Sequence, residues 1–131
     1  MSNRSSDTDR LFKPAPKKIL LVDDRDDVRI TTKWFLNNFG YVVDSVPNAE
    51  KALLVFNPSV HQLVITDNRM PGISGSELAS KLKEISPGTP IVMYTGQPPE
   101  SVSAVDVVLQ RPTHLLALKE TVDRLLAVAV S

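Results

Sequence analysis

The sequence of 131 residues contains no cysteine, no excess of charge of either sign and no long hydrophobic run. The absence of cysteine excludes a disulfide framework, a thiol nucleophile and zinc-finger spacing, and it fits the reducing cytoplasm, where we expect the protein to act. Because 15 basic residues balance 15 acidic residues, charge gives no argument for direct binding to nucleic acid. No apolar run approaches the ~20 residues that span a bilayer, and the polar N-terminus does not resemble a signal peptide, so we expect no membrane insertion.

The remaining composition is typical of one small globular domain. Hydrophobic residues make up 42% of the chain, which argues against disorder, and the length is sufficient for a single core. Residues 1–16 are polar and proline-rich at their end, so we expect a flexible leader there that either has no role or serves as a docking tail. We expect one domain over residues 17–131.

The most informative segment surrounds Asp67. Residues 63–65 form a short apolar run of the kind found in parallel strands that are buried on both faces. Asp67 falls where this run ends, and a Met-Pro-Gly sequence then interrupts the pattern before an amphipathic segment over residues 76–85. The sequence therefore predicts a strand that delivers a carboxylate to a loop, at the sheet edge where α/β proteins bind ligands.

A second apolar run over residues 18–22 ends in the same way, in Asp23 and Asp24. If the two strands are neighbours, three carboxylates converge on one crevice. Like charges at such close range are unfavourable unless a cation neutralises them, and hard divalent ions such as Mg²⁺ take carboxylate, carbonyl and water oxygens as ligands. The pattern thus predicts a site for a metal ion and then for a phosphate.

Apolar periodicity and turn residues predict the other elements. These are helices over residues 26–39, 49–56 and 114–128, and strands over residues 41–46, 91–94 and 105–109. Trp34 and Phe35 are expected in the core, because large aromatic side chains are usually buried. His61 and His114 lie outside any motif, and we expect surface or capping positions for both.

Three features in chain order resemble the receiver domain of response regulators in bacterial two-component systems, the CheY-like family. They are the strand ending in Asp23 and Asp24, the strand ending in Asp67 with Met-Pro-Gly and Gly75 beyond it, and the strand ending in Thr95. The resemblance covers residues 17 to 128. It implies a flavodoxin-like α/β fold, a doubly wound five-stranded parallel sheet of order 2-1-3-4-5 with helices on both faces.

The resemblance also implies a phosphoacceptor rather than an enzyme. Asp67 would take a phosphoryl group from a phosphohistidine on a sensor histidine kinase or phosphotransfer protein, and would then signal to an unknown downstream protein. Asp24 would bind Mg²⁺, or Mn²⁺ in its place, directly, and Asp23 would bind it directly or through water. Asp67 itself and the backbone carbonyl of Arg69 would complete the protein ligands.

Two further residues would hold the phosphoryl oxygens. Thr95 corresponds to the family's switch hydroxyl, although a threonine at this point can also merely cap the next segment. Arg111 stands where the family has lysine, and its planar guanidinium keeps the charge but differs in shape and geometry from an ammonium group. Alternatively, Arg111 is a surface ion-pair residue. The family usually has a cis peptide bond before the proline that corresponds to Pro112.

The sequence departs from the family at the switch aromatic and at the fourth helix, which belongs to the surface through which typical receivers signal. Val108 occupies the position of the family's switch aromatic, and a valine cannot act as a large rotamer toggle. Residues 97–104 carry two prolines and leave room for a turn or two, so we predict a truncated or irregular fourth helix in this crossover.

Two other functions remain open at this stage. One is a pseudo-receiver, which would keep the fold and bind partners without phosphorylation. The other is a phosphohydrolase with Asp24 as the nucleophile, because residues 24–28 contain an Asp-x-Asp-x-Val pattern similar to the haloacid-dehalogenase loop, in a chain with little room for that family's other motifs. Few residues follow the last expected helix, so we expect a stand-alone receiver or a fragment of a longer regulator.

Overall fold

The computed structural model describes residues 16–99 and 103–130, which form a parallel sheet of order β2-β1-β3-β4-β5. Its strands are β1 (Lys18–Val22), β2 (Val42–Val46), β3 (Leu63–Thr66), β4 (Ile91–Thr95) and β5 (Val107–Gln110). The helices of the described residues are α2 (Asp26–Asn38), α3 (Ala49–Val55), α4 (Gly75–Ile85) and α5 (Leu115–Val130). The predicted fold class and strand order are confirmed. The expected leader falls almost entirely on residues 1–15, which lie outside the described residues.

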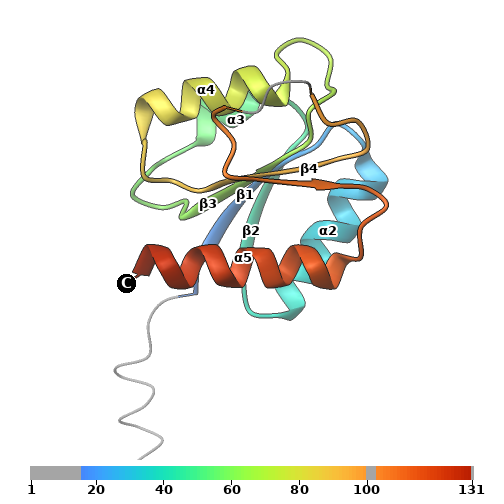
Figure 1. Cartoon of the computed structure of the whole chain (residues 1–131), viewed down its shortest axis with the longest axis vertical. Coiled ribbons are helices and arrows are strands. Elements are labelled where there is room, and N and C mark those ends of the chain that lie inside the picture. The colour runs from blue at the N-terminus through green and yellow to red at the C-terminus, as the bar shows by residue number, and fades with distance from the viewer. Residues whose placement is uncertain (1–15, 100–102, 131) are drawn as a thin grey trace, which may run out of the picture.

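The sheet is covered by α3 and α4 on one face and by α2 and α5 on the other (Figure 1). Strand side chains alternate between these faces, so Ile19 and Leu21 join one apolar cluster with Leu36 of α2 and Leu118 of α5. Leu20 and Val22 face the second cluster, with α3 and α4. Because β1 lies in the sheet interior and is buried on both faces, its sequence is continuously apolar.

The pairing register brings the ends of β1 and β3 to the same level. Val22 pairs with Thr66 in the parallel ladder, and the amide of Asp67 donates to the carbonyl oxygen of Val22 over 2.9 Å. The residue that follows each strand is therefore placed at one edge of the sheet, beside the other. Asp23 and Asp67 are these two residues.

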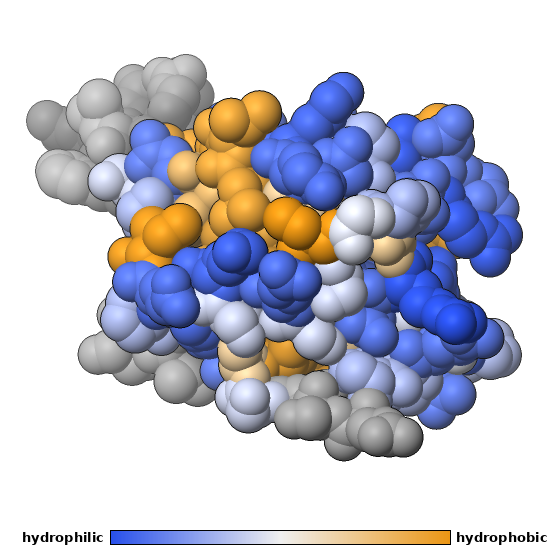
Figure 2. Space-filling view, turned by 90° about the horizontal axis from the view of Figure 1, so that it is seen from above, coloured by the Kyte–Doolittle hydropathy of each residue, from blue (hydrophilic) through white to orange (hydrophobic). Residues whose placement is uncertain are grey.

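Apolar surface gathers on the side of the molecule that α3 and α4 cover, where it is bordered by hydrophilic side chains (Figure 2). The large hydrophobic residues exposed on these helices are Leu54, Val55 and Ile85. All three lie at the C-terminal ends of helices that run antiparallel to the strands. This apolar surface therefore lies toward the edge of the sheet opposite Asp23 and Asp67.

The truncated or irregular helix predicted between β4 and β5 falls partly on residues 100–102, which lie outside the described residues of this crossover. Its described residues, 96–99 and 103–106, contain a turn at Ser103 and Ala104 but no helix. Ala104 and Val105 pack against the apolar cluster under α3 and α4. Asp106 then accepts the Ile91 amide over 2.7 Å and the Lys83 ammonium over 2.9 Å. Strand β5 consequently begins at Val107, two residues later than predicted.

Two predictions about single side chains were wrong. Trp34 is 66% exposed, because it lies on the face of α2 opposite the buried residues Thr32 and Leu36; its neighbour Phe35 does pack against the core. His61 is 3% exposed, since both of its ring nitrogens have partners. Its Nε2 lies 2.8 Å from Asp44 Oδ2 and its Nδ1 accepts the Asn57 amide over 3.1 Å. This hydrogen bond from His61 lowers the pKa of Asp44.

None of the helices within residues 16–99 and 103–130 has the combination of length and apolar character that a membrane crossing requires. His114 lies just before α5, where its Nδ1 accepts the amide of Leu116 over 3.3 Å, so the expected capping position is confirmed.

Candidate functional site

Three carboxylates meet at the edge of the sheet where β1 and β3 end. One oxygen from each of Asp23, Asp24 and Asp67 lies within 4.8 Å of the others. Asp23 and Asp67 are 2% and 5% exposed, whereas Asp24 is more accessible to solvent. Two buried anions at this separation repel each other strongly, because solvent does not screen them well. The site therefore requires positive charge.

Arg111 supplies part of that charge. It follows β5, and its amide donates to the carbonyl oxygen of Thr95 over 2.7 Å, which fixes the backbone beside β4. Its Nη1 lies 3.6 Å from Asp23 Oδ2 and its Nη2 lies 3.5 Å from Asp67 Oδ2. The side chain is 17% exposed, so the guanidinium belongs to the site rather than to the outer surface. The peptide bond between Arg111 and Pro112 is cis.

The loop that carries Asp67 is held by the beginning of α4. Asp67 Oδ1 accepts the amide of Asn68 over 2.7 Å, and the carbonyl oxygen of Asn68 accepts the amide of Gly75 over 2.9 Å. The Asn68 side chain accepts both the amide and the hydroxyl of Ser76. Ser74 caps the helix by accepting the Glu77 amide over 3.1 Å. The geometry of the acidic loop is thus coupled to the first turn of a helix.

A hollow of about 370 Å³ opens above the carboxylates, and its lining includes Asp24, Asp67, Arg69, Thr95, Gln97 and Arg111. Thr95 is buried at the end of β4, where its hydroxyl accepts the Gln97 amide over 3.2 Å. In this state Thr95 therefore caps the loop after the strand. Arg69 donates a hydrogen bond to the side chain of Gln97 across the hollow. Val108 pairs with Met93 in the sheet and is not part of this lining.

The donor set fits a hard divalent cation. All three side chains of the acidic cluster offer carboxylate oxygens, which are the preferred ligands of Mg²⁺. One guanidinium cannot balance three carboxylates, and the charge that remains affects protonation. Burial, reinforced by the nearby Asp67 carboxylate, raises the pKa of Asp23 to about 6, although the Arg25 amide that it accepts acts in the opposite direction.

This raised pKa predicts how stability depends on pH in the absence of metal. The folded state holds the Asp23 proton more tightly than the unfolded chain does. The contribution of this proton to the free energy of unfolding is therefore fully present below about pH 4 and is lost as pH rises through about 6. When a chelator keeps the protein free of metal, we expect the free energy of unfolding to fall by about 2 kcal/mol between about pH 4.5 and about pH 7. Urea denaturation at a series of pH values measures this slope.

Asp23→Asn is the control for that slope, because asparagine occupies a similar volume and does not titrate. We expect the pH dependence in this interval to flatten in the variant. An unchanged slope would assign the effect to other groups and contradict the raised pKa of Asp23.

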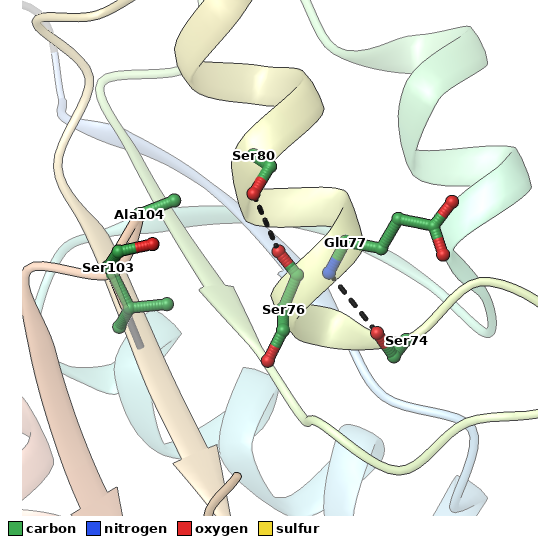
Figure 3. Close-up of a pocket in the computed structure, with 7 residues that line it drawn as sticks. Ser74, Ser76, Glu77, Ser80, Ser103 and Ala104 are labelled. Atoms are coloured by element: carbon green, nitrogen blue, oxygen red, sulfur yellow. Dashed lines mark hydrogen bonds between the residues drawn. The ribbon is translucent and has the colours of Figure 1, made fainter. Parts of the chain in front are cut away.

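A second hollow, of about 320 Å³, lies beside α4 on the side facing the irregular crossover (Figure 3). Hydroxyl groups of Ser76, Ser80 and Ser103 line it together with Ala104, and the Ser80 hydroxyl donates to the Ser76 carbonyl oxygen over 3.3 Å. It forms where the crossover passes α4 as a turn. Sequence reasoning did not predict this hollow.

Sequence reasoning also missed Tyr94. This residue on β4 precedes Thr95, and its ring centroid lies 5.4 Å from Arg111 Cζ. The available signal was strand alternation, which places the residue before Thr95 on the opposite face of β4. In the structure its hydroxyl reaches Thr113, beyond β5, on that face. The aromatic ring of Tyr94 lies under the guanidinium of Arg111, which stands where the family has lysine, and the two side chains form a stacked pair.

A parallel sheet of this order is the flavodoxin-like fold, and here two neighbouring strands end in acidic residues. Residues 19–121 match the family model of the response regulator receiver domain. The chain belongs to this family.

Relatives and solved structures agree with this assignment. The response regulator receiver protein CpdR of Brucella abortus is 33% identical over 119 residues, which cover 86% of this chain and 99% of CpdR. The sensor kinase/phosphatase LuxN of Vibrio harveyi is 33% identical over 106 residues, covering 77% of this chain. This chain spans 12% of the length of LuxN and 20% of a putative transcriptional regulator of Haloferax volcanii.

Among solved structures, the response regulator TrrA of Thermotoga maritima in complex with Mg²⁺ and BeF superposes with a TM-score of 0.78 at 34% identity. The match covers 83% of this chain and 98% of that chain.

Proposed function

We propose that this receiver domain accepts a phosphoryl group on Asp67 from a phosphohistidine of a partner kinase or phosphotransfer protein, with Mg²⁺ or Mn²⁺ bound. The observation that supports it is the convergence of three carboxylates, one oxygen from each within 4.8 Å of the others, beside the Arg111 guanidinium. TrrA, which is similar to this chain, has been crystallised with Mg²⁺ and BeF and, separately, with the histidine kinase ThkA. The phosphorylated domain would then signal through contacts with other proteins.

The cation would be held by Asp23, Asp24, Asp67 and the backbone carbonyl of Arg69. When bound, it supplies positive charge that reduces the repulsion between the carboxylate nucleophile and the incoming phosphoryl group. Asp23 must be deprotonated to bind it, so protons and the metal compete at this residue.

Asp67 provides the nucleophile. Its Oδ1 is fixed by the Asn68 amide, which leaves Oδ2 as the oxygen that faces Arg111. An oxygen of the carboxylate forms a bond to phosphorus while the bond from phosphorus to the histidine nitrogen breaks, and the imidazole takes the electron pair. Catalysis of such a transfer consists mainly of positioning and electrostatic stabilisation.

Arg111 and Thr95 would hold the phosphoryl oxygens. Thr95 would exchange its contact with Gln97 for one with the phosphoryl group, and β4 with its following loop would adjust. A local change in charge would then favour one of two states of this loop.

A pseudo-receiver is the second candidate, and two observations favour it. Arg111 already lies between Asp23 and Asp67, where it offsets part of the charge without a metal. Moreover, residues 96–99 and 103–106 contain no helix, in a crossover where the resemblance implies a fourth helix that belongs to the output surface.

Intact mass spectrometry after incubation with acetyl phosphate and Mg²⁺ tests the proposal. We expect one phosphoryl adduct that forms with Mg²⁺ and is absent when a chelator is added. No adduct under conditions that modify an ordinary receiver, and none from a set of candidate histidine kinases, would favour the pseudo-receiver.

A further inference from the structure

Tyr94 contacts both Arg111 and the backbone that follows it. The Arg111 guanidinium lies over the Tyr94 ring, with 5.4 Å between Cζ and the ring centroid. The Tyr94 hydroxyl donates to the carbonyl oxygen of Thr113 over 3.1 Å, beyond Pro112. Burial raises the pKa of Tyr94, so this hydroxyl keeps its proton at neutral pH. The tyrosine therefore touches both the side chain of Arg111 and the backbone that follows it.

Tyr94 is closely packed. It is 6% exposed in the apolar cluster between the sheet and helices α2 and α5, and it belongs to an interior strand. A planar guanidinium stacks well on an aromatic face, whereas the ammonium of lysine is a compact and strongly hydrated charge. The aromatic platform thus suits the arginine at position 111.

Arg111 is held at an unusual distance from its carboxylates. Its nitrogens lie 3.6 Å from Asp23 Oδ2 and 3.5 Å from Asp67 Oδ2, longer than the ~2.8 Å of a charge-assisted hydrogen bond. Nη1 is buried and has no hydrogen-bond partner among the described residues. An arginine beside two carboxylates ordinarily closes on them, so another contact holds this guanidinium back.

We propose that Tyr94 is a positioning residue that keeps the Arg111 guanidinium stacked beside the acidic cluster and prevents it from closing on Asp67. This inference rests on the proposed function. It explains two observations together: the ion pairs are long, and Nη1 keeps an unused donor. The held guanidinium offsets charge while leaving Asp67 Oδ2 free to react and Nη1 free to bind a phosphoryl oxygen.

A set of four proteins tests the inference: wild type, Tyr94→Leu, Arg111→Lys and the double variant. Without the ring, Arg111 closes on Asp67, and we expect phosphorylation by acetyl phosphate to slow roughly three- to tenfold. In the Arg111→Lys background the same substitution should have almost no further effect, because lysine does not use the platform. Tyr94→Phe keeps the ring, and its rate should stay close to that of wild type.

Two matched controls separate positioning from packing. Phe35→Leu removes an aromatic ring that packs against the same apolar cluster, and Tyr41→Phe removes a hydroxyl that donates to Asp123 of α5. Both should leave the phosphorylation rate unchanged. Equal slowing by Tyr94→Leu in the arginine and lysine backgrounds, or equal slowing by Tyr94→Phe, would overturn the inference.

A spectroscopic readout does not depend on phosphorylation. The Tyr94 ring current should shift the Nε–H signal of Arg111 upfield in ¹H–¹⁵N spectra, and the signal is assigned by its loss in Arg111→Lys. We expect the shift to persist in Tyr94→Phe and to disappear in Tyr94→Leu; an unchanged signal in Tyr94→Leu would overturn the inference. A wild type that takes up no phosphoryl group would instead overturn the proposed function, while this signal would still decide whether Tyr94 fixes Arg111.

Discussion

Asp67→Asn is expected to abolish the phosphoryl adduct. The amide of asparagine is not a nucleophile at neutral pH, and no other carboxylate of the cluster has the same position at the end of β3. The substitution preserves size and should preserve the fold, because Asn68 can still donate to the remaining side-chain oxygen. Intact mass after incubation with acetyl phosphate and Mg²⁺, together with circular dichroism of the variant, measures both effects.

Asp26→Asn is the matched control for Asp67→Asn. Asp26 is an exposed acid at the start of α2, where it pairs with Arg29 over 2.6 Å. It lies outside the acidic cluster, so its removal should leave the adduct intact. Retention of the adduct in Asp67→Asn would contradict the assignment of the acceptor, and a label on Asp24 would revive the phosphohydrolase hypothesis.

Gly75→Ala is expected to disrupt the acidic loop. A Cβ atom at this position would lie 2.0 Å from the carbonyl oxygen of Asp67 and 2.9 Å from Asn68 Cα. Both contacts are with backbone, so no side-chain rotation can relieve them. We expect the free energy of unfolding to fall by about 3 kcal/mol, at the upper end of the usual cost of overpacking.

The same clash should also impair phosphorylation. The helix start is fixed by Ser74 and by the hydrogen bonds of Asn68, so the displacement would fall on Asp67. We expect the initial rate of adduct formation to fall by at least about tenfold, since displacing a reacting group by about 1 Å can lower a reaction rate by about a hundredfold.

Gly88→Ala provides the control for Gly75→Ala. No atom lies within 4 Å of a Cβ built on Gly88, so alanine should be neutral there for both stability and rate. Urea denaturation and the initial rate of adduct formation compare the two variants. Equal unfolding free energies for Gly75→Ala and wild type would show that the loop accommodates the methyl group, against this expectation.

Local sequence predicted the fold because its signals were consistent. Continuous apolar runs identified the buried strands, and the acids that ended two of them indicated a shared edge, where Asp23, Asp24 and Asp67 indeed meet. The roles of Thr95 and Arg111 came from the resemblance and remain predictions.

Two of the errors have a common physical origin in contacts between residues that are distant along the chain. His61 is buried because Asp44 of β2 pairs with it, and sequence pattern does not reveal such a partner. The start of β5 depends on Lys83 and Ile91, which bind Asp106 from two other elements. Trp34 is different, since helical periodicity alone places it opposite Leu36, and general burial tendency was the weaker guide.

The short crossover between β4 and β5 also bears on how the chain folds. Ile91 and Asp106 are joined by a hydrogen bond although they are 15 residues apart along the chain. The other strand pairs close longer loops, as in the pairing of Val64 with Ile91 or of Lys18 with Val42. Because the entropic cost of loop closure grows with loop length, β5 joins the sheet at the lowest cost of any strand. The shortness of this crossover thus makes the last strand the most local part of the folding topology.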